Sequence, residues 1–218
     1  MGSSIKTTYW SNTQGALDSL RQADSHPHRA DGEGVLLELI PTSVHRVLDL
    51  SGGDGRLVRL LQIDRPQTEF VAFGFPGPAL EQLRKNLLKI PSVDVQEALP
   101  KLVAHDLICE LPDLGRFDAV VCGLALHELE LERQRELYQE VYDRLTPGGI
   151  FANLSHVASP SFVLHELYLQ KVGKQDVIPR ACRVDVQTQL RWLEDVGFVD
   201  VDCYWKWLEL ALVAGAKP

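Results

Sequence analysis

The segment Val47-Leu-Asp-Leu-Ser-Gly-Gly-Asp-Gly-Arg-Leu57 decides the fold of this chain. Its first half is a short apolar run, which is typical of a buried β-strand over residues 46–50. Glycines follow at once, and they allow positive φ angles and a close approach of a ligand to the main chain. A helix is predicted from Asp54, because Leu57 and Leu61 then share one face. Open amides at the start of that helix favour a bound carboxylate or phosphate.

Outward from this segment, strand-like and helix-like stretches alternate along the chain. Further strands are predicted at residues 70–73, 102–104 (with 93–95 as the alternative third strand), 117–123 and 150–157. Helices are predicted at residues 35–40, from Pro78 onward, at 130–145 and at 187–196. Residues 146–149, Thr-Pro-Gly-Gly, are expected to stop the helix before them.

The last two predicted strands, residues 198–205 and 207–214, have no helix between them. They must therefore be antiparallel neighbours, joined by a tight turn near Lys206. Together with the alternation before them, they predict an α/β fold. We expect a Rossmann-like, doubly wound seven-stranded sheet, mostly parallel with an antiparallel C-terminal β-hairpin and with helices on both faces.

The length of 218 residues predicts a single domain over residues 1–218 that buries its own core. Within it, residues 1–30 are polar and are expected to form an N-terminal cap segment, with a short helix at 14–22. Residues 158–186 have the weakest pattern, apart from one helix candidate at 162–172. We expect this stretch to be a lid or substrate insertion, because insertions at this position often cover a substrate.

Charge and composition exclude several classes of function. The net charge of −8 disfavours a nucleic-acid partner, and no apolar run is long enough to span a membrane. The N-terminal residues have no apolar signal region, so a cytoplasmic location is expected by elimination. His165-Glu166 does not continue into a zinc motif because position 169 is Leu, and the cysteines have no metal-ligand spacing. We therefore expect no metal, a small-molecule substrate, and a monomer or homodimer.

The pattern of glycines narrows the choice of ligand classes. A dinucleotide fingerprint needs three glycines in the order GxGxxG, whereas the series here runs Gly53, Gly55, Val58. The third glycine is missing, which disfavours a nicotinamide cofactor. The P-loop ending in Gly-Lys-Ser/Thr is absent as well.

Four motifs together resemble the class I S-adenosylmethionine-dependent methyltransferases. Asp49-x-Ser51-x-Gly53-x-Gly55 is similar to that family's acidic-x-Gly-x-Gly-x-Gly loop. The stretch 117–129 resembles its fourth strand and the turn after it, 145–149 its Leu-x-Pro-Gly-Gly turn, and 193–198 its Leu-x-x-x-Gly-Phe entry to strand six. The resemblance covers residues 31–157 and 187–216.

The resemblance implies S-adenosylmethionine as the cofactor and assigns residues to it. The glycine loop would hold the methionine part, through Asp49, Ser51, Gly52, Gly53 and Gly55. Gly74 and Phe75 would follow the second strand beside the cofactor, Asp106 would meet the adenine amino group next to Leu107, Leu124 would line the cofactor, and Arg29 would reach its carboxylate.

The chain departs from the family at two of these positions. Ser51 replaces the first glycine, which is a mild change because serine is small. Gly74 stands where the family has an acid that binds both ribose hydroxyls, and losing such a charged pair costs about 1–3 kcal/mol of binding. Either another group supplies the contact, or the enzyme binds weakly, or the fold has become a non-catalytic binding protein. Aminopropyl transfer is a further alternative, because residues 52–55 also resemble spermidine synthases.

For methyl transfer, the sequence offers two candidate bases. The reaction is an in-line displacement, so the enzyme mainly aligns the nucleophile with the methyl carbon and sulfur. An oxygen nucleophile usually needs a base as well. His127 follows the fourth strand and His156 the fifth, both at the active edge of the sheet. The alternative is that each histidine serves only packing or a local hydrogen bond. The expected acceptor is an oxygen or nitrogen of a small molecule.

Overall fold

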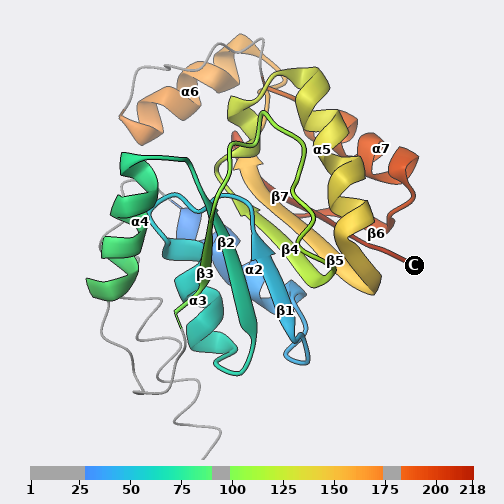
Figure 1. The fold of residues 1–218 in the computed structure, drawn as a ribbon. Helices are drawn as coiled ribbons and strands as arrows, with labels where there is room; N and C mark the ends of the chain where they lie inside the picture. The colour runs from blue at the N-terminus through green and yellow to red at the C-terminus, as the bar shows by residue number, and fades with distance from the viewer. Residues whose placement is uncertain (1–27, 90–98, 174–182) are drawn as a thin grey trace, which may run out of the picture.

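A computed structural model describes residues 28–89, 99–173 and 183–218 (Figure 1). One seven-stranded sheet runs through these residues in the order β3-β2-β1-β4-β5-β7-β6. The strands are β1 (Arg46–Asp49), β2 (Glu69–Gly74), β3 (Lys101–Ala104), β4 (Phe117–Gly123), β5 (Leu145–His156), β6 (Val199–Trp207) and β7 (Leu210–Ala216). The preferred third strand is confirmed, and the alternative at residues 93–95 lies outside the described residues.

The strand directions confirm the predicted fold class. β3, β2, β1, β4 and β5 are parallel, whereas β7 is antiparallel to both β5 and β6. The chain reverses its direction of winding between β1 and β4, because β1 pairs with β2 on one side and with β4 on the other. Ligands of doubly wound sheets bind at this switch point, beyond the carboxyl ends of the strands.

Helices cover both faces of the sheet (Figure 1). They are α2 (Arg29–Leu39), α3 (Arg56–Asp64), α4 (Pro78–Lys89), the 3₁₀ helix η1 (Leu126–Glu128), α5 (Leu131–Arg144), α6 (Phe162–Val172) and α7 (Val186–Val196). Because successive side chains of a strand point to opposite faces of the sheet, they pack into two hydrophobic cores, one on each face. Val47 packs with α2, α3 and α4, whereas its neighbour Leu48 packs with α5 and α7. None of the helices in the described ranges is long and apolar enough to cross a membrane.

The hairpin turn differs from the prediction. We expected it near Lys206, but Trp207 pairs with Leu210, so the turn is formed by Leu208 and Glu209. The physical reason is a buried ion cluster. Glu209 is fully buried, and its carboxylate binds His165 Nδ1 of α6 at 2.7 Å and Arg183. These partners are distant in the sequence, and they fix the turn without any local turn residue.

Two other boundaries also moved. The first described helix begins at Arg29 rather than Val35, and β5 begins at Leu145, so the Thr-Pro-Gly-Gly stretch is already extended strand. The helix at residues 162–172 is confirmed as α6, which lies above the edge where the parallel strands end (Figure 1). Residues 1–27 of the expected cap segment, with the helix at 14–22, lie outside the described part, as do residues 174–182 of the expected insertion, whereas residues 28–30 of the cap lead into α2.

A buried ion cluster joins α2 to α3. The side chain of Glu33 is only 1% exposed and lies between two arginines. Arg29 Nε donates to Glu33 Oε1 at 2.8 Å, and Arg56 donates from Nε at 2.9 Å and from Nη2 at 2.6 Å. Because Arg56 is the first residue of α3, this cluster fixes the helix that follows the glycine loop.

We expect Glu33→Gln to destabilise the fold by about 3 kcal/mol, because it leaves two guanidinium groups in a buried site without their carboxylate. Urea unfolding followed by circular dichroism measures this change. Glu81→Gln is the matched control, since Glu81 and Arg84 form a solvent-exposed pair at 4.0 Å. The control should change stability by less than about 0.5 kcal/mol. Equal effects of the two variants would show that the Glu33 cluster does not hold α2 on α3.

Candidate cofactor site

The loop between β1 and α3 needs glycine at three positions for different reasons. Gly52, Gly53 and Gly55 have φ angles of +53°, +47° and +86°. A Cβ on Gly52 would lie 1.6 Å from the carbonyl oxygen of Phe73, so only glycine lets the loop cross the end of β2. A Cβ on Gly55 would lie 2.9 Å from Leu87 of α4. Gly53 alone faces open space, with its nearest neighbour 3.9 Å away.

The two carboxylate oxygens of Asp49, at the end of β1, differ: one accepts hydrogen bonds, and the other accepts none from the described residues. Oδ1 accepts hydrogen bonds from the backbone amide of Ser51 at 2.9 Å and from its hydroxyl at 2.5 Å. Oδ2 is buried and has no hydrogen-bond partner among the described residues. Burial raises the pKa of Asp49 above its ordinary value, against these hydrogen bonds. An unpaired buried carboxylate oxygen fits a ligand that brings its own cationic donor.

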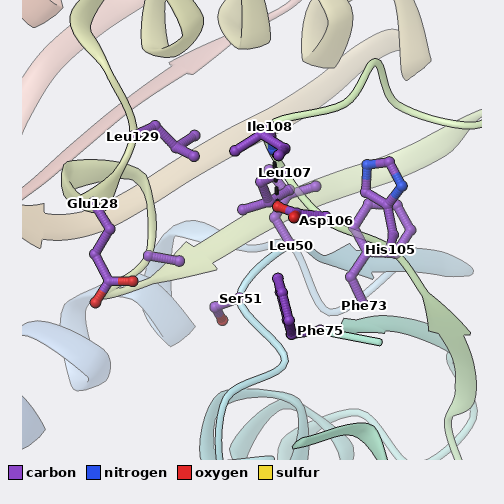
Figure 2. Close-up of a pocket in the computed structure, with 11 residues that line it drawn as sticks. Leu50, Ser51, Phe73, Phe75, His105, Asp106, Leu107, Ile108, Glu128 and Leu129 are labelled. Carbon is purple, nitrogen blue, oxygen red and sulfur yellow. Dashed lines mark hydrogen bonds between the residues drawn. The ribbon is translucent and has the colours of Figure 1, made fainter. Parts of the chain in front are cut away.

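A cavity of about 330 Å³ opens beside this loop (Figure 2). It lies within the size range of small-molecule sites. Figure 2 shows Glu128 and Leu129 on one side of it and Phe73 and His105 on the other. Its lining residues are Leu50, Ser51, Phe73, Phe75, His105, Asp106, Leu107, Ile108, Ala125, Glu128 and Leu129.

The cavity brings together four of the residues expected at the site. Ser51, Phe75, Asp106 and Leu107 come from the ends of three different strands and line one space. Phe75 is 61% exposed at the rim, so its ring is available to a planar ligand. Asp106 Oδ1 accepts the amide of Ile108 at 3.1 Å, and that bond turns the loop after β3 back over the cavity.

Gly74, at the end of β2, has no room for the acid that the family resemblance would place there. A Cβ at this position would lie 2.5 Å from Leu80 Cδ1 and 3.2 Å from Leu83 Cδ2. Leu80 of α4 therefore fills the place of that side chain. The replacement fits the packing of α4 on β2, and an acid at this position would require the Leu80 side chain to move.

The other predicted site residues are not among those that line this cavity: Arg29, Asp49, Gly52, Gly53, Gly55, Gly74, Leu124, His127 and His156. Arg29 Nε is committed to Glu33. Leu124 adopts a left-handed conformation with φ 62°, donates its amide to Leu154 at 2.8 Å, and packs against the core on the α2 and α3 side.

Sequence reasoning missed several residues that line the cavity. Most are immediate neighbours of predicted residues in the chain, so a search on either side of Asp106 would have found His105 and Ile108. Glu128 likewise adjoins the predicted His127, whereas Leu129 carries no such signal, since it reaches the cavity only because η1 folds back over the end of β4.

The two candidate bases lie together at the ends of β4 and β5. The rings of His127 and His156 meet edge to face, with 4.6 Å between their centroids. His127 Nδ1 is 3.0 Å from the hydroxyl of Ser155, and His156 Nδ1 is 3.2 Å from the hydroxyl of Tyr168 in α6. All four side chains are at most 8% exposed. The arrangement consists of two hydrogen-bonded pairs, His127 with Ser155 and His156 with Tyr168, whose two imidazole rings pack against each other.

The comparisons with known proteins agree with this architecture. Residues 48–151 match the family model of a methyltransferase domain. Three solved structures are similar in fold. They are an O-methyltransferase family protein from Burkholderia thailandensis (TM-score 0.68, 16% identity, 97% of this chain), the apo form of the S-adenosylmethionine-dependent methyltransferase SibL (0.66, 24%, 85%), and human N-acetylserotonin methyltransferase with its bound methyl donor (0.63, 17%, 100%).

The chain covers 62%, 54% and 60%, respectively, of the lengths of these three structures. No curated protein sequence matches it. The family match spans the glycine loop, β4 and the start of β5, which are the elements that form the switch point. Residues 48–151 thus resemble a methyltransferase domain, and the chain shares the seven-stranded, Rossmann-like fold of the S-adenosylmethionine-dependent methyltransferases.

Proposed function

We propose that this protein binds S-adenosylmethionine beside the β1–α3 loop and transfers its methyl group to an oxygen or nitrogen of a small molecule. One observation carries the proposal: Asp49 Oδ2 is buried without a hydrogen-bond partner among residues 28–89, 99–173 and 183–218, in a loop whose next exposed position, Gly53, is open. The amino group of the cofactor is a cation of the kind that this oxygen lacks. The cofactor supplies a methyl group already activated by its sulfonium.

We assign different residues to different parts of the cofactor. Asp49 and the amides that begin α3 hold the amino-acid part, because a helix start favours a carboxylate. Phe75 packs on the planar base, and Asp106 accepts a hydrogen bond from its amino group. Support also comes from the human relative, which is described with S-adenosylmethionine bound.

We assign the general base to His127, whose ring packs edge to face against that of His156. Ser155 holds the orientation of the His127 ring through its hydroxyl. Burial excludes water from this group of residues, which strengthens the hydrogen bonds among them. The rest of the rate enhancement comes from positioning the acceptor against the methyl group, because an in-line displacement requires the reacting atoms to be aligned.

A second candidate, a non-catalytic binding protein on the same fold, is favoured by Gly74 and Leu80. Without a carboxylate at the end of β2, the affinity for a ribose is lower by tenfold to a hundredfold, on the order of 1–3 kcal/mol. The negative net charge of −8 favours a small-molecule acceptor over a nucleic acid for either candidate.

We expect Asp49→Asn to weaken binding of S-adenosylhomocysteine by at least about tenfold, because the new amide turns a donor toward the ligand's ammonium group. The unliganded protein should be as stable as the wild type or more so, since the variant no longer buries a charge. For the wild type, affinity should fall as pH decreases through the raised pKa of Asp49, because only the ionised form attracts the ammonium. Isothermal calorimetry from pH 5 to 8 measures both effects.

Asp54→Asn is the matched control for Asp49. It makes the same change of charge in the same loop, at an exposed residue whose carboxylate accepts the amide of Arg56 at 3.0 Å. An asparagine keeps this bond, so affinity should stay within twofold. If both variants bind like the wild type, Asp49 does not contact the ligand.

We expect His127→Gln to lower the rate of methyl transfer by about 10²- to 10⁴-fold, the usual contribution of a general base. Affinity for S-adenosylhomocysteine should not change. The assay follows transfer of a labelled methyl group to a panel of phenols and primary amines. His45→Gln is the control, because His45 is exposed at the opposite ends of the strands. A wild-type protein that binds the cofactor and methylates no member of the panel would favour the non-catalytic candidate.

A further inference from the structure

The loop after β3 forms one wall of the cavity without any regular secondary structure. His105, Asp106, Leu107 and Ile108 all line the space. Two bonds fold the loop locally, from the amide of Ile108 to Asp106 Oδ1 at 3.1 Å and from the amide of Cys109 to the Asp106 carbonyl at 2.9 Å. These bonds shape the loop, but they do not set its distance from the rest of the site.

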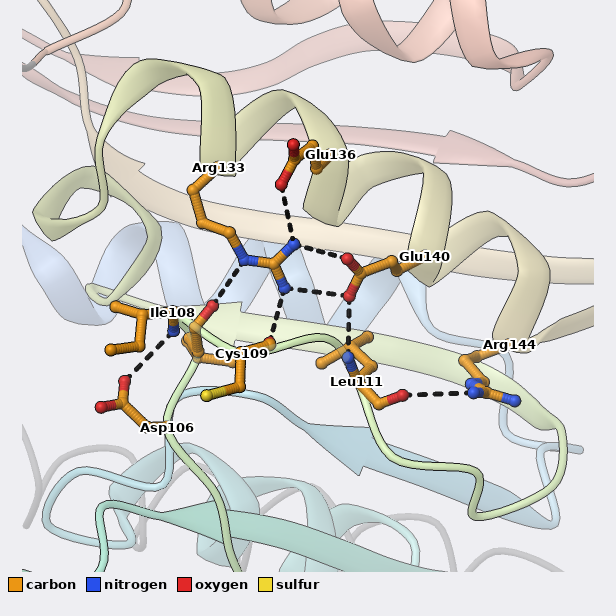
Figure 3. A network of polar contacts seen from close by, with 9 residues as sticks. Asp106, Ile108, Cys109, Leu111, Arg133, Glu136, Glu140 and Arg144 are labelled. Atoms are coloured by element: carbon orange, nitrogen blue, oxygen red, sulfur yellow. Dashed lines mark hydrogen bonds and ion pairs between the residues drawn. The ribbon is translucent and has the colours of Figure 1, made fainter.

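That distance is set by Arg133 in the first turn of α5 (Figure 3). Its Nε donates to the carbonyl of Leu107 at 2.8 Å, and its Nη2 donates to the carbonyl of Cys109 at 2.7 Å. One planar guanidinium thus holds two carbonyls on either side of Ile108. A lysine has a single ammonium and cannot reproduce this fork.

Glu140, two turns further along α5, orients the guanidinium. Its Oε1 lies 2.5 Å from Arg133 Nη1 and its Oε2 lies 2.9 Å from Nη2, and Oε2 also accepts the amide of Leu111 at 2.8 Å. Burial would raise the pKa of Glu140, but its bonds to Arg133 and to the Leu111 amide outweigh that effect and lower the pKa. The pair therefore stays ionised and ties the loop to α5 at three backbone positions.

The next residue of α5 holds the opposite side of the cavity. Gln134 is 3% exposed, and its Nε2 donates to the carbonyl of Leu129 at 2.7 Å. Leu129 lies across the cavity from His105 in Figure 2. Two consecutive side chains of one helix turn therefore fix the two walls relative to each other.

We propose that Arg133, oriented by Glu140, is a positioning residue that sets the affinity of the site for the nucleoside part of its ligand. It acts by holding the Asp106 wall and does not touch the ligand or the reacting atoms. This inference rests on the proposed function, because the nucleoside is the part of the cofactor assigned to that wall.

The test compares two ligands on the full chain by isothermal calorimetry. S-adenosylhomocysteine carries the nucleoside and the amino-acid part, whereas 5′-methylthioadenosine lacks the amino-acid part. Arg133→Ala should weaken both ligands by the same factor, about 10- to 100-fold, because two charge-assisted hydrogen bonds to the wall are lost. Asp49→Asn should weaken only S-adenosylhomocysteine. In Arg133→Ala, a loss of folded protein would lower the number of sites titrated, whereas the proposed role predicts a lower affinity at an unchanged number of sites.

Three further variants distinguish the effect of the forked hydrogen bonds of Arg133 from the effects of its charge and of altered folding. Arg133→Lys keeps the charge and should remain at least about threefold weaker than the wild type, since a single ammonium cannot reproduce the planar fork of the guanidinium. Glu140→Gln, which frees the guanidinium to turn, should weaken both ligands in the same direction as Arg133→Ala. Arg135→Ala is the control, because Arg135 is exposed on the same helix, and its affinities should stay within twofold of the wild type.

Wild-type protein that binds neither ligand would contradict the proposed function. Wild-type protein that binds both, with a folded Arg133→Ala variant within twofold of it, would overturn the positioning role alone. Should Arg133→Ala fail to fold, full wild-type affinity in Arg133→Lys or Glu140→Gln would overturn it as well.

Discussion

The close crossing of the glycine loop over the end of β2 is the constraint on which the rest of the site depends. Because Gly52 lies against the carbonyl of Phe73, the loop can turn directly from β1 into α3. That turn leaves Asp49 buried with one oxygen that no described residue pairs, and it leaves Gly53 facing open space. A side chain at Gly52 would push the loop away from the sheet and separate the two ends of the proposed cofactor site.

The fold and the site are joined through helices that pack on opposite faces of the sheet. On one face, Glu33 fixes the start of α3 and so the end of the glycine loop. On the other, the first turn of α5 fixes both walls of the cavity. The catalytic proposal depends on a third helix, α6, whose Tyr168 meets His156 and whose His165 is anchored by Glu209. Helices that are distant from one another in the sequence thus assemble the site around the short glycine loop between β1 and α3.

Local pattern was enough to predict the sheet, because each strand and helix carries its own periodicity. The same holds for Asp49, the last residue of the first strand, whereas Asp106, two residues after β3, was assigned through the family resemblance. The turn at Leu208 and Glu209 was misplaced because its determinant is an ion cluster with residues 26 and 44 positions away. The hydrogen bonds from Arg133 to the loop after β3 were not predicted for the same reason. The sequence alone indicates that a charged residue on a helix is exposed to solvent, and its carbonyl partners are known only from the structure.

The claim at the centre of this account is that Asp49 and Asp106 hold the two ends of one ligand. A crystal structure of the protein grown with S-adenosylhomocysteine tests it directly. We predict density in the cavity with the ligand's amino group against Asp49 Oδ2 and its adenine between Phe75 and Asp106. Density at another position, or an empty cavity at saturating ligand with Asp49 Oδ2 bonded to a side chain of the protein, would contradict the account.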